Sequence, residues 1–408
     1  MRVGAPADLR AGRECGAYRG RVTSTDATPH APLLSDLTTL RVGGPARSLV
    51  RASSEAELVD AVRAADADGV PVLVLGGGSN LVVADEGFDG VVVQDVREGV
   101  TVDMVDSCGG GSFRVPAGHG WDALVEQAVA EQWIGLEALS GIPGTVGAAP
   151  VQNIGAYGQE VAGVLSTVRV WDRAEQRVRT LAVGELGLGY RTSVLKRSTV
   201  ADAAGRSWRP SPRWVVLEVG FQTRLGTLSP GVAYAELARR LGVEVGERVP
   251  TADVRAAVLE LRGAKGMLAA GVGEHAADHD RWSAGSFFTN PVLPVALAGG
   301  LPEGAPRFEV RSALPAATTG PSLGAVDPGL VKTSAAWLIE HAGFGKGFGL
   351  DGEASAARLS TRHTLALTNR GGATAADVVA LARTVRDGVL ERFGVRLEPE
   401  PVLVGLEL

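Results

Sequence analysis

Residues 135–161 read GLEALSGIPGTVGAAPVQNIGAYGQEV, and this stretch decides how the chain is organised. Glycine and proline disfavour a helix interior by about 1 and about 3 kcal/mol per position, which excludes a regular helix here. Apolar residues such as Leu139 and Ile154 require burial, which argues against an exposed linker. We expect a tight, backbone-lined surface that lets something large and flat approach closely. A glycine-rich packing loop is the alternative.

The composition sets limits on the class of protein. With 408 residues the chain exceeds the roughly 250–300 at which a single hydrophobic core stops growing, so we expect two or three domains. A hydrophobic content of 45% and a net charge of −6 are typical of a soluble globular protein and argue against nucleic-acid or anionic-membrane binding. The N-terminus lacks the apolar segment of a signal peptide. Cys15 and Cys108 lie in unlike contexts, which indicates no disulfide framework and a reducing cytoplasm.

A strand, a helix and a second strand are predicted ahead of a glycine-rich loop. The first strand covers residues 47–52, and the helix begins at Ser54, where Glu57 completes a capping box. Gly69 ends the helix, and the apolar residues 72–75 are typical of a buried parallel strand. This βαβ unit leads into Gly76, Gly77, Gly78, Ser79 and Asn80.

The loop at residues 76–80 fits neither common nucleotide-binding motif. A Rossmann fingerprint needs a third glycine and a following helix, but Leu81 continues as strand. A Walker A loop needs Gly-Lys-Ser/Thr, which does not occur in this chain. A backbone nest with a hydroxyl and an amide is suited to binding a pyrophosphate through N–H donors. A simple tight turn is the alternative.

The remaining elements are predicted from periodicity and caps. We expect a helix over residues 121–132, a hairpin of strands 168–172 and 177–181, a strand over 214–224, and helices from Thr251 and from Thr374 to Gly394. The proline- and glycine-rich residues 292–330 are predicted to form a variable loop. His275 and His279 have a spacing that could bind zinc on a helix, but no third ligand is evident, so we predict no metal site.

Four polar side chains stand in apolar or glycine-rich surroundings. Arg191 would need an anion if buried, although a structural ion pair is the alternative. Ser286 follows a glycine that permits close approach, but buried serines mostly bond to backbone. An apolar setting would favour the protonated form of Glu400 and suit it to donate a proton, unless it is an exposed charge on an edge strand. Tyr234 could be core or a binding tip. No local pattern connects these residues.

Several segments, taken in order, resemble the UDP-N-acetylenolpyruvoylglucosamine reductase family, flavoenzymes that make UDP-N-acetylmuramate for the bacterial cell wall. These segments are TTLRVGGPA (38–46), VLGGGSNLVVAD (74–85), the stretch at 135–161, GYRTSVLK (189–196), GSFFTNP (285–291), AAWLIEHAGFGKGF (335–348) and LEPEPVLVG (397–405). The resemblance runs from about Leu37 to Gly405. The tail through Pro32 and the long stretch at 292–330 depart from the family pattern.

The resemblance implies an α+β fold: a vanillyl-alcohol-oxidase/PCMH-type FAD-binding fold of two α+β subdomains, plus a C-terminal α+β substrate-binding domain. The implied boundaries are a disordered tail at 1–32, FAD-binding subdomains at 33–95 and 96–225, the second joined by the terminal strand 396–408, and a substrate-binding domain at 245–395. FAD would bind noncovalently, mainly through backbone. The implied cofactor-binding residues are Gly76, Gly77, Gly78, Ser79, Asn80, Gly141, Ile142, Gly144, Thr145, Gly147, Ala148 and Ile154.

The resemblance also implies a reaction. NADPH would reduce the flavin and leave, and enolpyruvyl-UDP-GlcNAc would enter the same cleft to accept a hydride from FAD N5. Arg191 and Glu400 match the family pair that polarises the substrate carboxylate, and Ser286 matches the proton donor. The residues that match the UDP-binding positions are Tyr234, Lys265 and Asn290. We therefore expect this chain to be a cytoplasmic monomer that binds neither nucleic acid nor membranes.

Two rival functions remain at the level of sequence. One is an oxidase of the same FAD fold, but many such enzymes attach the flavin to a His or Cys where this chain has Ser79 and Asn80. The other is a non-catalytic protein that senses a UDP-sugar or a flavin. The presence of Arg191, Ser286 and Glu400 argues against the sensor.

Overall fold

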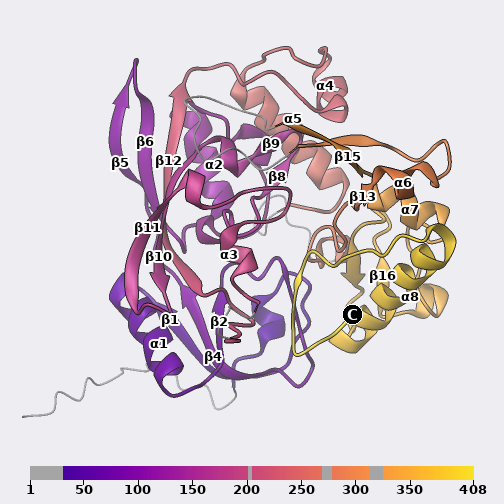
Figure 1. The fold of residues 1–408 in the computed structure, drawn as a ribbon, viewed down its shortest axis with the longest axis horizontal. Coiled ribbons are helices and arrows are strands. Elements are labelled where there is room, and N and C mark those ends of the chain that lie inside the picture. The colour runs from indigo at the N-terminus through magenta and orange to yellow at the C-terminus, as the bar shows by residue number, and fades with distance from the viewer. Residues whose placement is uncertain (1–30, 201–204, 269–277, 312–324) are drawn as a thin grey trace, which may run out of the picture. The chain divides into compact units, whose positions relative to one another are not determined.

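The computed structural model describes residues 31–200, 205–268, 278–311 and 325–408 (Figure 1). The chain divides into Met1–Ala31 and one compact unit, Pro32–Leu408, and the fold below is that of the second unit. The predicted N-terminal tail, Cys15 and His275 lie outside the described residues, apart from the last residues of the tail. None of the helices in the described ranges is long and apolar enough to span a membrane.

A small parallel sheet follows a short 3-10 turn, η1 (Leu34–Leu37). Its strands are β1 (Ala46–Ala52), β4 (Phe88–Asp95) and β2 (Val72–Leu75), in the order β1-β4-β2. The helix α1 (Glu55–Ala67) links β1 to β2 and packs its buried side chains into a core shared with them. The predicted strand–helix–strand unit is therefore present, but β4 lies between its two strands and pairs in parallel with both.

The start of α1 differs from the prediction in one detail. The hydroxyl of Ser54 accepts the N–H of Glu57 at 3.2 Å, as expected for an N-cap. The carboxylate of Glu57, however, accepts the N–H of Ser53 at 2.8 Å. The reciprocal hydrogen bond of the predicted capping box therefore comes from one residue earlier and still anchors the first turn.

The second sheet is antiparallel and has the strand order β11-β10-β12-β6-β5. It contains β5 (Thr101–Asp106), β6 (Gly110–Pro116), β10 (Leu165–Asp172), β11 (Arg177–Ala182) and β12 (Trp214–Leu225), and the short β7 (Trp133–Ile134) pairs with β12. The predicted hairpin is confirmed as β10 and β11. The helix α2 (Trp121–Ala130) packs Trp121 and Leu124 into the core of this sheet.

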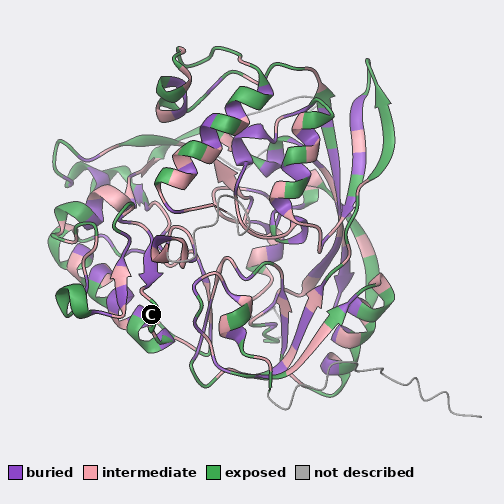
Figure 2. Cartoon of the chain, turned by 180° about the vertical axis from the view of Figure 1, so that it is seen from behind, coloured by how far each residue is buried: buried purple, intermediate pink, exposed green. Residues whose placement is uncertain are grey.

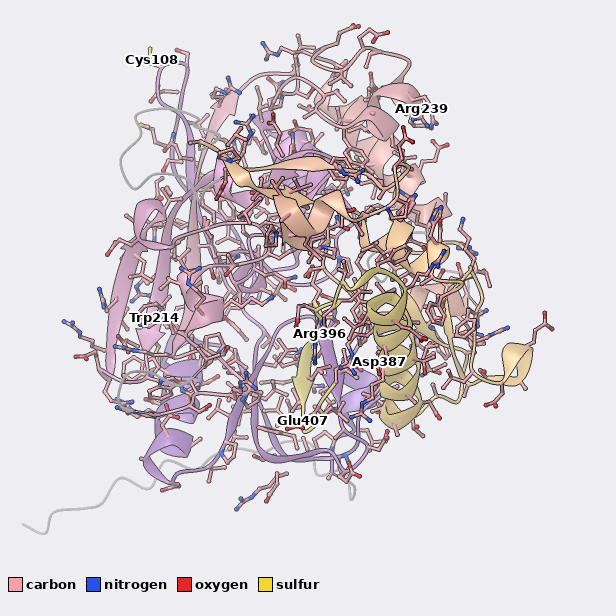
Figure 3. The ribbon with its side chains drawn as sticks, turned by 45° about the vertical axis from the view of Figure 1, so that its right-hand side comes forward. Cys108, Trp214, Arg239, Asp387, Arg396 and Glu407 are labelled. Carbon is pink, nitrogen blue, oxygen red and sulfur yellow. The ribbon has the colours of Figure 1, made fainter. Side chains whose placement is uncertain are left out.

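The outer strand β5 was not predicted, because it has no buried face to give an alternating pattern. All of its residues are exposed, and it is green along its length in Figure 2. Cys108 lies in the turn between β5 and β6 and is also exposed (Figure 3). This hairpin is the edge of the sheet.

The central glycine-rich stretch connects α2 to β10 without a regular helix, as expected. It contains single 3-10 turns and two-residue strands: η2 (Glu137–Leu139), η3 (Val146–Ala148), β8 (Gly155–Ala156), β9 (Gln159–Glu160) and η4 (Val161–Gly163). Leu136, Leu139 and Val146 are fully buried in the core of the second sheet. Between β11 and β12 the chain forms η5 (Val183–Glu185) and the short helix α3 (Val194–Arg197).

The C-terminal region mixes helices with two small sheets. Its elements are α4 (Ala235–Leu241), α5 (Thr251–Ala264), η6 (His279–Arg281), β13 (Val292–Pro294), α6 (Val295–Gly299), β14 (Phe308–Arg311), β15 (Val326–Lys332), α7 (Ala335–His341), η7 (Gly352–Ala354), β16 (Ala357–Leu359), β17 (Leu367–Asn369) and α8 (Ala375–Phe393). The helix α8 has Thr374 as its N-cap, as predicted, forms a capping box between Thr374 and Asp377, and ends at Gly394 in the left-handed conformation. The predicted variable loop at 292–330 is wrong where the chain is described, because β13, β14 and β15 form an antiparallel sheet there.

The C-terminal strand β18 (Val402–Val404) pairs in parallel with β3 (Leu81–Val83), which directly follows the glycine loop. The prediction that residues 396–408 join the subdomain at 96–225 is therefore wrong in this respect, since β3 belongs to residues 33–95. The carbonyl of Asn80 accepts the N–H of Val402 at 2.9 Å. This pairing brings Glu400 alongside the glycine loop.

Candidate active site

A cavity of about 2330 Å³ opens between the glycine loop at 76–80, the central stretch and the C-terminal segment. It is larger than the roughly 300–1,000 Å³ of a typical small-molecule pocket, so it has room for more than one ligand. Most residues predicted to bind cofactor, and all those predicted to be catalytic, line it: Gly76, Gly77, Gly78, Ser79, Asn80, Ile142, Gly144, Thr145, Gly147, Ala148, Ile154, Arg191, Ser286 and Glu400.

Two glycine loops approach each other so closely that the first could not carry a side chain at Gly77. A Cβ at Gly77 would lie 2.7 Å from the Cα of Gly144. Gly78 has a φ of +63°, and a Cβ there would lie 1.8 Å from the carbonyl oxygen of Leu37. The hydroxyl of Ser79 donates to the carbonyl of Pro143 at 2.9 Å and ties the loops together. The result is a backbone-lined cradle that fits a flat, pyrophosphate-bearing cofactor.

Gly141 is an exception, because it is not among the residues that line the cavity. Its N–H donates to Oδ1 of Asp122 at 2.6 Å, and Arg255 binds both oxygens of that carboxylate at 2.7 and 3.0 Å. Burial opposes the ionisation of Asp122, but the hydrogen bonds from Arg255 and Gly141 outweigh it, and the pKa of Asp122 lies below its ordinary value. Gly141 therefore anchors the central stretch to α2 and α5.

Arg191 and Glu400 meet in the cavity as an ion pair. Nε of Arg191 lies 2.9 Å from Oε1 of Glu400, and the two side chains are only 23% and 11% exposed. The Nε–H is not aligned for a hydrogen bond to the oxygen. Nη2 of Arg191 donates to the carbonyl of Gly155 at 3.0 Å, so the guanidinium is held from a second side. A cation and a carboxyl group are thus placed where a carboxylate ligand could be bound.

Two polar residues beside this pair were not identified from the sequence. Nε2 of Gln152 donates to Oε1 of Glu400 at 3.2 Å, and Nζ of Lys196 lies 3.4 Å from Oε1 of Gln152. Both line the cavity. The one feature of the sequence that could have identified them is that each is a polar residue inside a segment that carries the family resemblance. Nothing in the local sequence separates them from solvated surface residues.

Arg262 is a further cation at the cavity wall that sequence reasoning missed. It is only 8% exposed, and Nη2 donates to the carbonyl of Met267 at 2.5 Å. Its Nε has no hydrogen-bond partner among the described residues. Burial lowers the pKa of this guanidinium to about 10. With Arg191 and Lys196, it makes the cavity suited to anionic ligands.

Ser286 is held at the cavity by its neighbours. Gly285 precedes it with a φ of +73°, and the N–H of Phe287 donates to the carbonyl of Leu365 at 2.7 Å. Phe287 and Phe288 are buried and pack edge to face with ring centroids 5.2 Å apart. The two aromatic rings fix the backbone, so the serine is carried on a rigid segment.

Tyr234, Lys265 and Asn290 do not line the cavity, and they fall into two groups. Nζ of Lys265 lies 2.7 Å from Oε2 of Glu236 and 5.6 Å from the ring centroid of Tyr157. Tyr157 in turn packs edge to face on Tyr234 at 5.7 Å, and burial raises the pKa of Tyr157 to about 12. Lys265 and Tyr234 are therefore brought together through Tyr157.

Asn290 belongs to the second group. Its Oδ1 accepts the N–H of Ala335 at the start of α7 at 2.9 Å, and its own N–H donates to the hydroxyl of Tyr190 at 3.2 Å. Tyr190 directly precedes Arg191, and Nζ of Lys332 lies 4.7 Å from the centroid of its ring. Asn290 thus has a structural role at α7 and a connection to the loop that carries Arg191.

Comparison with family models identifies two segments of the chain. Residues 46–181 match a family model described as a FAD binding domain. Residues 276–404 match the model of the UDP-N-acetylenolpyruvoylglucosamine reductase C-terminal domain. The α+β fold, the backbone-lined cradle and the first of these matches define a FAD-binding oxidoreductase.

Close relatives cover nearly the whole chain. The chain is 54% identical over 395 residues to UDP-N-acetylenolpyruvoylglucosamine reductase of Nocardia farcinica, covering 96% of this chain and 93% of that one. It is 50% identical over 372 residues to the protein of the same name from Cutibacterium acnes, covering 91% and 89%. The chain belongs to the UDP-N-acetylenolpyruvoylglucosamine reductase family.

A solved structure agrees with this assignment. The crystal structure of UDP-N-acetylenolpyruvylglucosamine reductase from Thermus caldophilus superposes with a TM-score of 0.54 at 26% identity, covering 91% of this chain and 97% of that one. The family resemblance and the fold class predicted from the sequence are confirmed. Family membership disfavours both the oxidase and the sensor.

Proposed function

We propose that this chain reduces the enolpyruvyl group of UDP-N-acetylenolpyruvoylglucosamine to give UDP-N-acetylmuramate, a peptidoglycan precursor, with FAD as cofactor and NADPH as reductant. The proposal rests on three side chains that converge on one cavity. Arg191, Ser286 and Glu400 come from distant segments and line the same cavity as the two glycine loops. Family membership at about half identity over most of the chain gives independent support.

The cradle made by the two glycine loops is the proposed FAD site. Its backbone N–H groups suit the pyrophosphate, and the absence of side chains suits a flat ring system. Ser79 and Asn80 offer no nucleophile of the His or Cys type, which agrees with noncovalent binding. Bound FAD supplies the redox chemistry, because it can accept a hydride from NADPH and deliver one to a carbon–carbon double bond.

Arg191 and Glu400 are proposed to bind the carboxylate of the enolpyruvyl group. Hydride addition to the neighbouring double bond builds negative charge beside this carboxylate, and preorganised charge is usually the largest catalytic contribution. Arg191 supplies the positive charge. Glu400 must be protonated or act through a hydrogen bond when the substrate is bound, because two ionised carboxylates would repel each other.

Ser286 is proposed to deliver a proton to the carbon beside the carboxylate. A serine hydroxyl is a weak acid, so its contribution depends on position and on a strongly basic, enolate-like acceptor. The buried Phe287 and Phe288 supply that position, because they fix the backbone on which the hydroxyl is carried.

Tyr234, Lys265 and Asn290 are proposed to bind the UDP portion. Lys265 is paired with Glu236 at 2.7 Å, so it would exchange this carboxylate for a phosphate when substrate binds. Tyr234 is 46% exposed and could close over the nucleotide with its ring. We also expect the protein to be cytoplasmic and monomeric. Light scattering after gel filtration would measure its molar mass and so test the monomeric state.

The two half-reactions test the function. Purified protein should be yellow, and NADPH without oxygen should bleach it. Adding enolpyruvyl-UDP-GlcNAc should then restore the colour with formation of UDP-N-acetylmuramate. Restoration by air alone, without an effect of the nucleotide sugar, would point to an oxidase. Colourless protein that still binds the UDP-sugar would point to a sensor.

A further inference from the structure

We propose that Gln152 is a positioning residue that orients Glu400, an inference that rests on the function proposed above. Its side-chain amide lies between three polar groups of the cavity. Oε1 of Gln152 accepts from Nδ2 of Asn80 at 3.2 Å and from Nζ of Lys196 at 3.4 Å. Nε2 of Gln152 donates to Oε1 of Glu400 at 3.2 Å. Gln152 therefore connects the glycine loop and α3 to the catalytic carboxyl.

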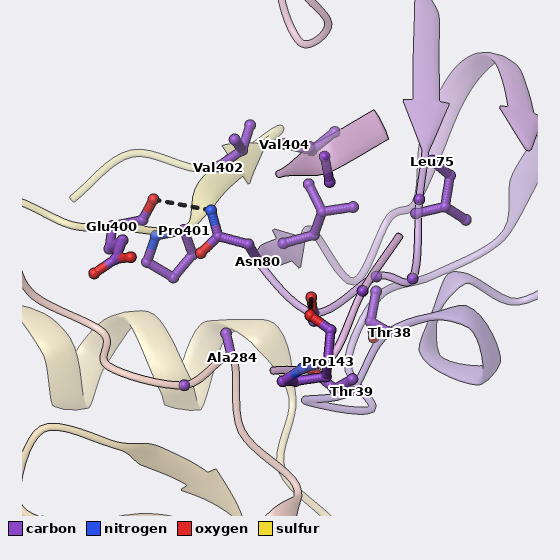
Figure 4. A pocket seen from close by; sticks show the side chains of 18 of the residues that line it. Thr38, Thr39, Leu75, Asn80, Pro143, Ala284, Glu400, Pro401, Val402 and Val404 are labelled. Atoms are coloured by element: carbon purple, nitrogen blue, oxygen red, sulfur yellow. Dashed lines mark hydrogen bonds between the residues drawn. The ribbon is translucent and has the colours of Figure 1, made fainter. Parts of the chain in front are cut away.

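The chemistry of the neighbours fixes which way this amide points. An ammonium can only donate, so Lys196 requires an acceptor at Gln152. Asn80 is fixed independently, because its Nδ2 also donates to the main-chain carbonyl of Glu400 at 3.3 Å (Figure 4). Rotating the amide of Gln152 would set its NH₂ group against both donors. The NH₂ group is therefore directed at Glu400.

This orientation makes the two oxygens of Glu400 unequal. The hydrogen bond from Gln152 and the closest approach of Arg191, at 2.9 Å, both fall on Oε1. Oε1 therefore accepts the hydrogen bond from Gln152 and is not available to carry a proton toward the substrate. When the substrate carboxylate arrives, one carboxyl group of the pair must take a proton. That proton belongs on Oε2 of Glu400, from which it can be donated to the substrate.

The charged and titratable groups that face Glu400 are Arg191 and Tyr190, from the loop before α3, and Lys196 on α3. Burial lowers the pKa of Lys196, Glu400 opposes this shift, and Arg191 adds to it. The N–H of Gln152 holds Glu400 by its hydrogen bond to Oε1. Removing it leaves the carboxyl group free to turn away from the position that meets the substrate, so the substrate-dependent step should slow.

The test compares Gln152→Met and Gln152→Glu with Gln222→Glu, which makes the same change at an exposed position on β12. At neutral pH we expect reoxidation of the reduced enzyme by the nucleotide sugar to slow about tenfold or more in both Gln152 variants, the factor for a hydrogen bond to a charged group. Reduction by NADPH should stay within about twofold. Gln222→Glu should match the wild type in both half-reactions.

A second readout does not use turnover. Calorimetric titration of the FAD-loaded enzyme with UDP-N-acetylmuramate, in two buffers of different ionisation enthalpy, measures the protons taken up on binding. The wild type should take up protons because the ligand carboxylate meets Glu400. Gln152→Glu should change that uptake, since it places a second carboxyl group beside Oε1.

Two outcomes would overturn the positioning role. One is Gln152 variants that match the wild type in reoxidation and proton uptake. The other is an equal loss in both half-reactions, which would indicate general disruption of the site. A wild-type enzyme that the nucleotide sugar does not reoxidise would overturn the proposed function instead, so the two failures are distinguishable.

Discussion

Nε of Arg191 lies 2.9 Å from Oε1 of Glu400, and Arg191 holds a left-handed backbone conformation with a φ of +52°. This φ is uncommon for a residue with a side chain. A tight turn enforces it, because the N–H and C=O groups of Gly189 and Thr192 bond to each other at 3.1 and 3.2 Å. The turn presents the guanidinium at the cavity, where the pairing of β18 with β3 presents the carboxyl group.

Arg191→Gly should leave the fold intact, since glycine adopts this φ without strain. Loss of the guanidinium should slow reoxidation by the nucleotide sugar about 10²- to 10³-fold, the usual effect of removing a preorganised group at a developing charge. Stopped-flow absorbance of the flavin measures both half-reactions. Gln176→Gly is the matched control, because Gln176 has a φ of +51° in an exposed hairpin turn. An Arg191→Gly enzyme with normal reoxidation would contradict the assigned role.

Ser286→Ala should leave flavin reduction by NADPH intact and slow reoxidation by the nucleotide sugar about 10²-fold or more, as expected for loss of a proton donor. Rapid-mixing absorbance in the two half-reactions checks this. Thr289→Ala is the control, since it removes a hydroxyl from the same segment, where it donates to the carbonyl of Glu398 at 3.4 Å. An equal loss in both half-reactions would remove Ser286 from the proton-donor role.

Gly77→Ala should destabilise the protein by about 1–3 kcal/mol and release FAD, because the new Cβ would lie 2.7 Å from the backbone of Gly144. The loops would have to separate, which opens the cradle. Gly163→Ala is the control, since a Cβ there would meet nothing within 4 Å. Urea unfolding and the flavin absorbance of purified protein are the measurements. A yellow, equally stable Gly77→Ala protein would refute the close packing of the loops.

Asp122→Asn should lower the free energy of unfolding by about 1–3 kcal/mol at neutral pH. The pKa of Asp122 is lower in the folded chain than its ordinary value, so its contribution is fully present above the unfolded pKa of about 3.9. It is lost as the pH falls through the folded pKa, and the variant and the wild type should converge in acid. Urea unfolding as a function of pH checks this.

Asp103→Asn is the control for that experiment, because Asp103 pairs with Arg114 on the exposed edge of the second sheet. Exposed pairs contribute little, so a much smaller effect is expected. A difference between Asp122→Asn and the wild type that does not change with pH would exclude ionised Asp122 as the source of the stability.

Lys265→Met should raise the KM for the nucleotide sugar about tenfold or more with a smaller change in kcat, because uniform binding to a phosphate is lost. Glu236→Gln should lower this KM, since the carboxylate 2.7 Å from Nζ competes for Lys265. Steady-state kinetics with saturating NADPH measures both. Lys346→Met, at an exposed position, should match the wild type. A Lys265→Met enzyme with an unchanged KM would exclude contact with the nucleotide.

The sequence predicted local features well where they depend on near neighbours. The capped helix from Thr374 to Gly394 and the hairpin of β10 and β11 are present as expected. The strands β13 and β15 were missed, because Pro294, Pro328 and Gly329 are residues typical of loops. Pro294 is tolerated because β13 is an edge strand. Its pairing with β15 depends on residues far along the chain, which local composition does not report.

The candidate site likewise has residues that the sequence identified and residues that only the folded chain reveals. The two glycine loops could be identified because missing side chains are visible in the sequence itself. Gln152 and Lys196 could not be identified from the sequence. They matter because Lys196 lies within hydrogen-bond distance of Gln152, and Gln152 in turn donates to Glu400. The position of the terminal strand was predicted wrongly for the same reason, since its partner β3 is fixed only by the folded chain.

The sequence by itself determined that residues 135–161 form no regular helix, that the loop at 76–80 has no side chains at its first three positions, and that the chain resembles its family. These are properties of covalent structure and short-range sterics, which each segment carries alone. The tertiary structure alone decided that Arg191 meets Glu400, that Gln152 donates a hydrogen bond to Glu400, and that Gly141 faces Asp122 instead of the cavity. Ion pairs, hydrogen bonds and burial depend on distance through space, and the order of residues along the chain does not specify that distance.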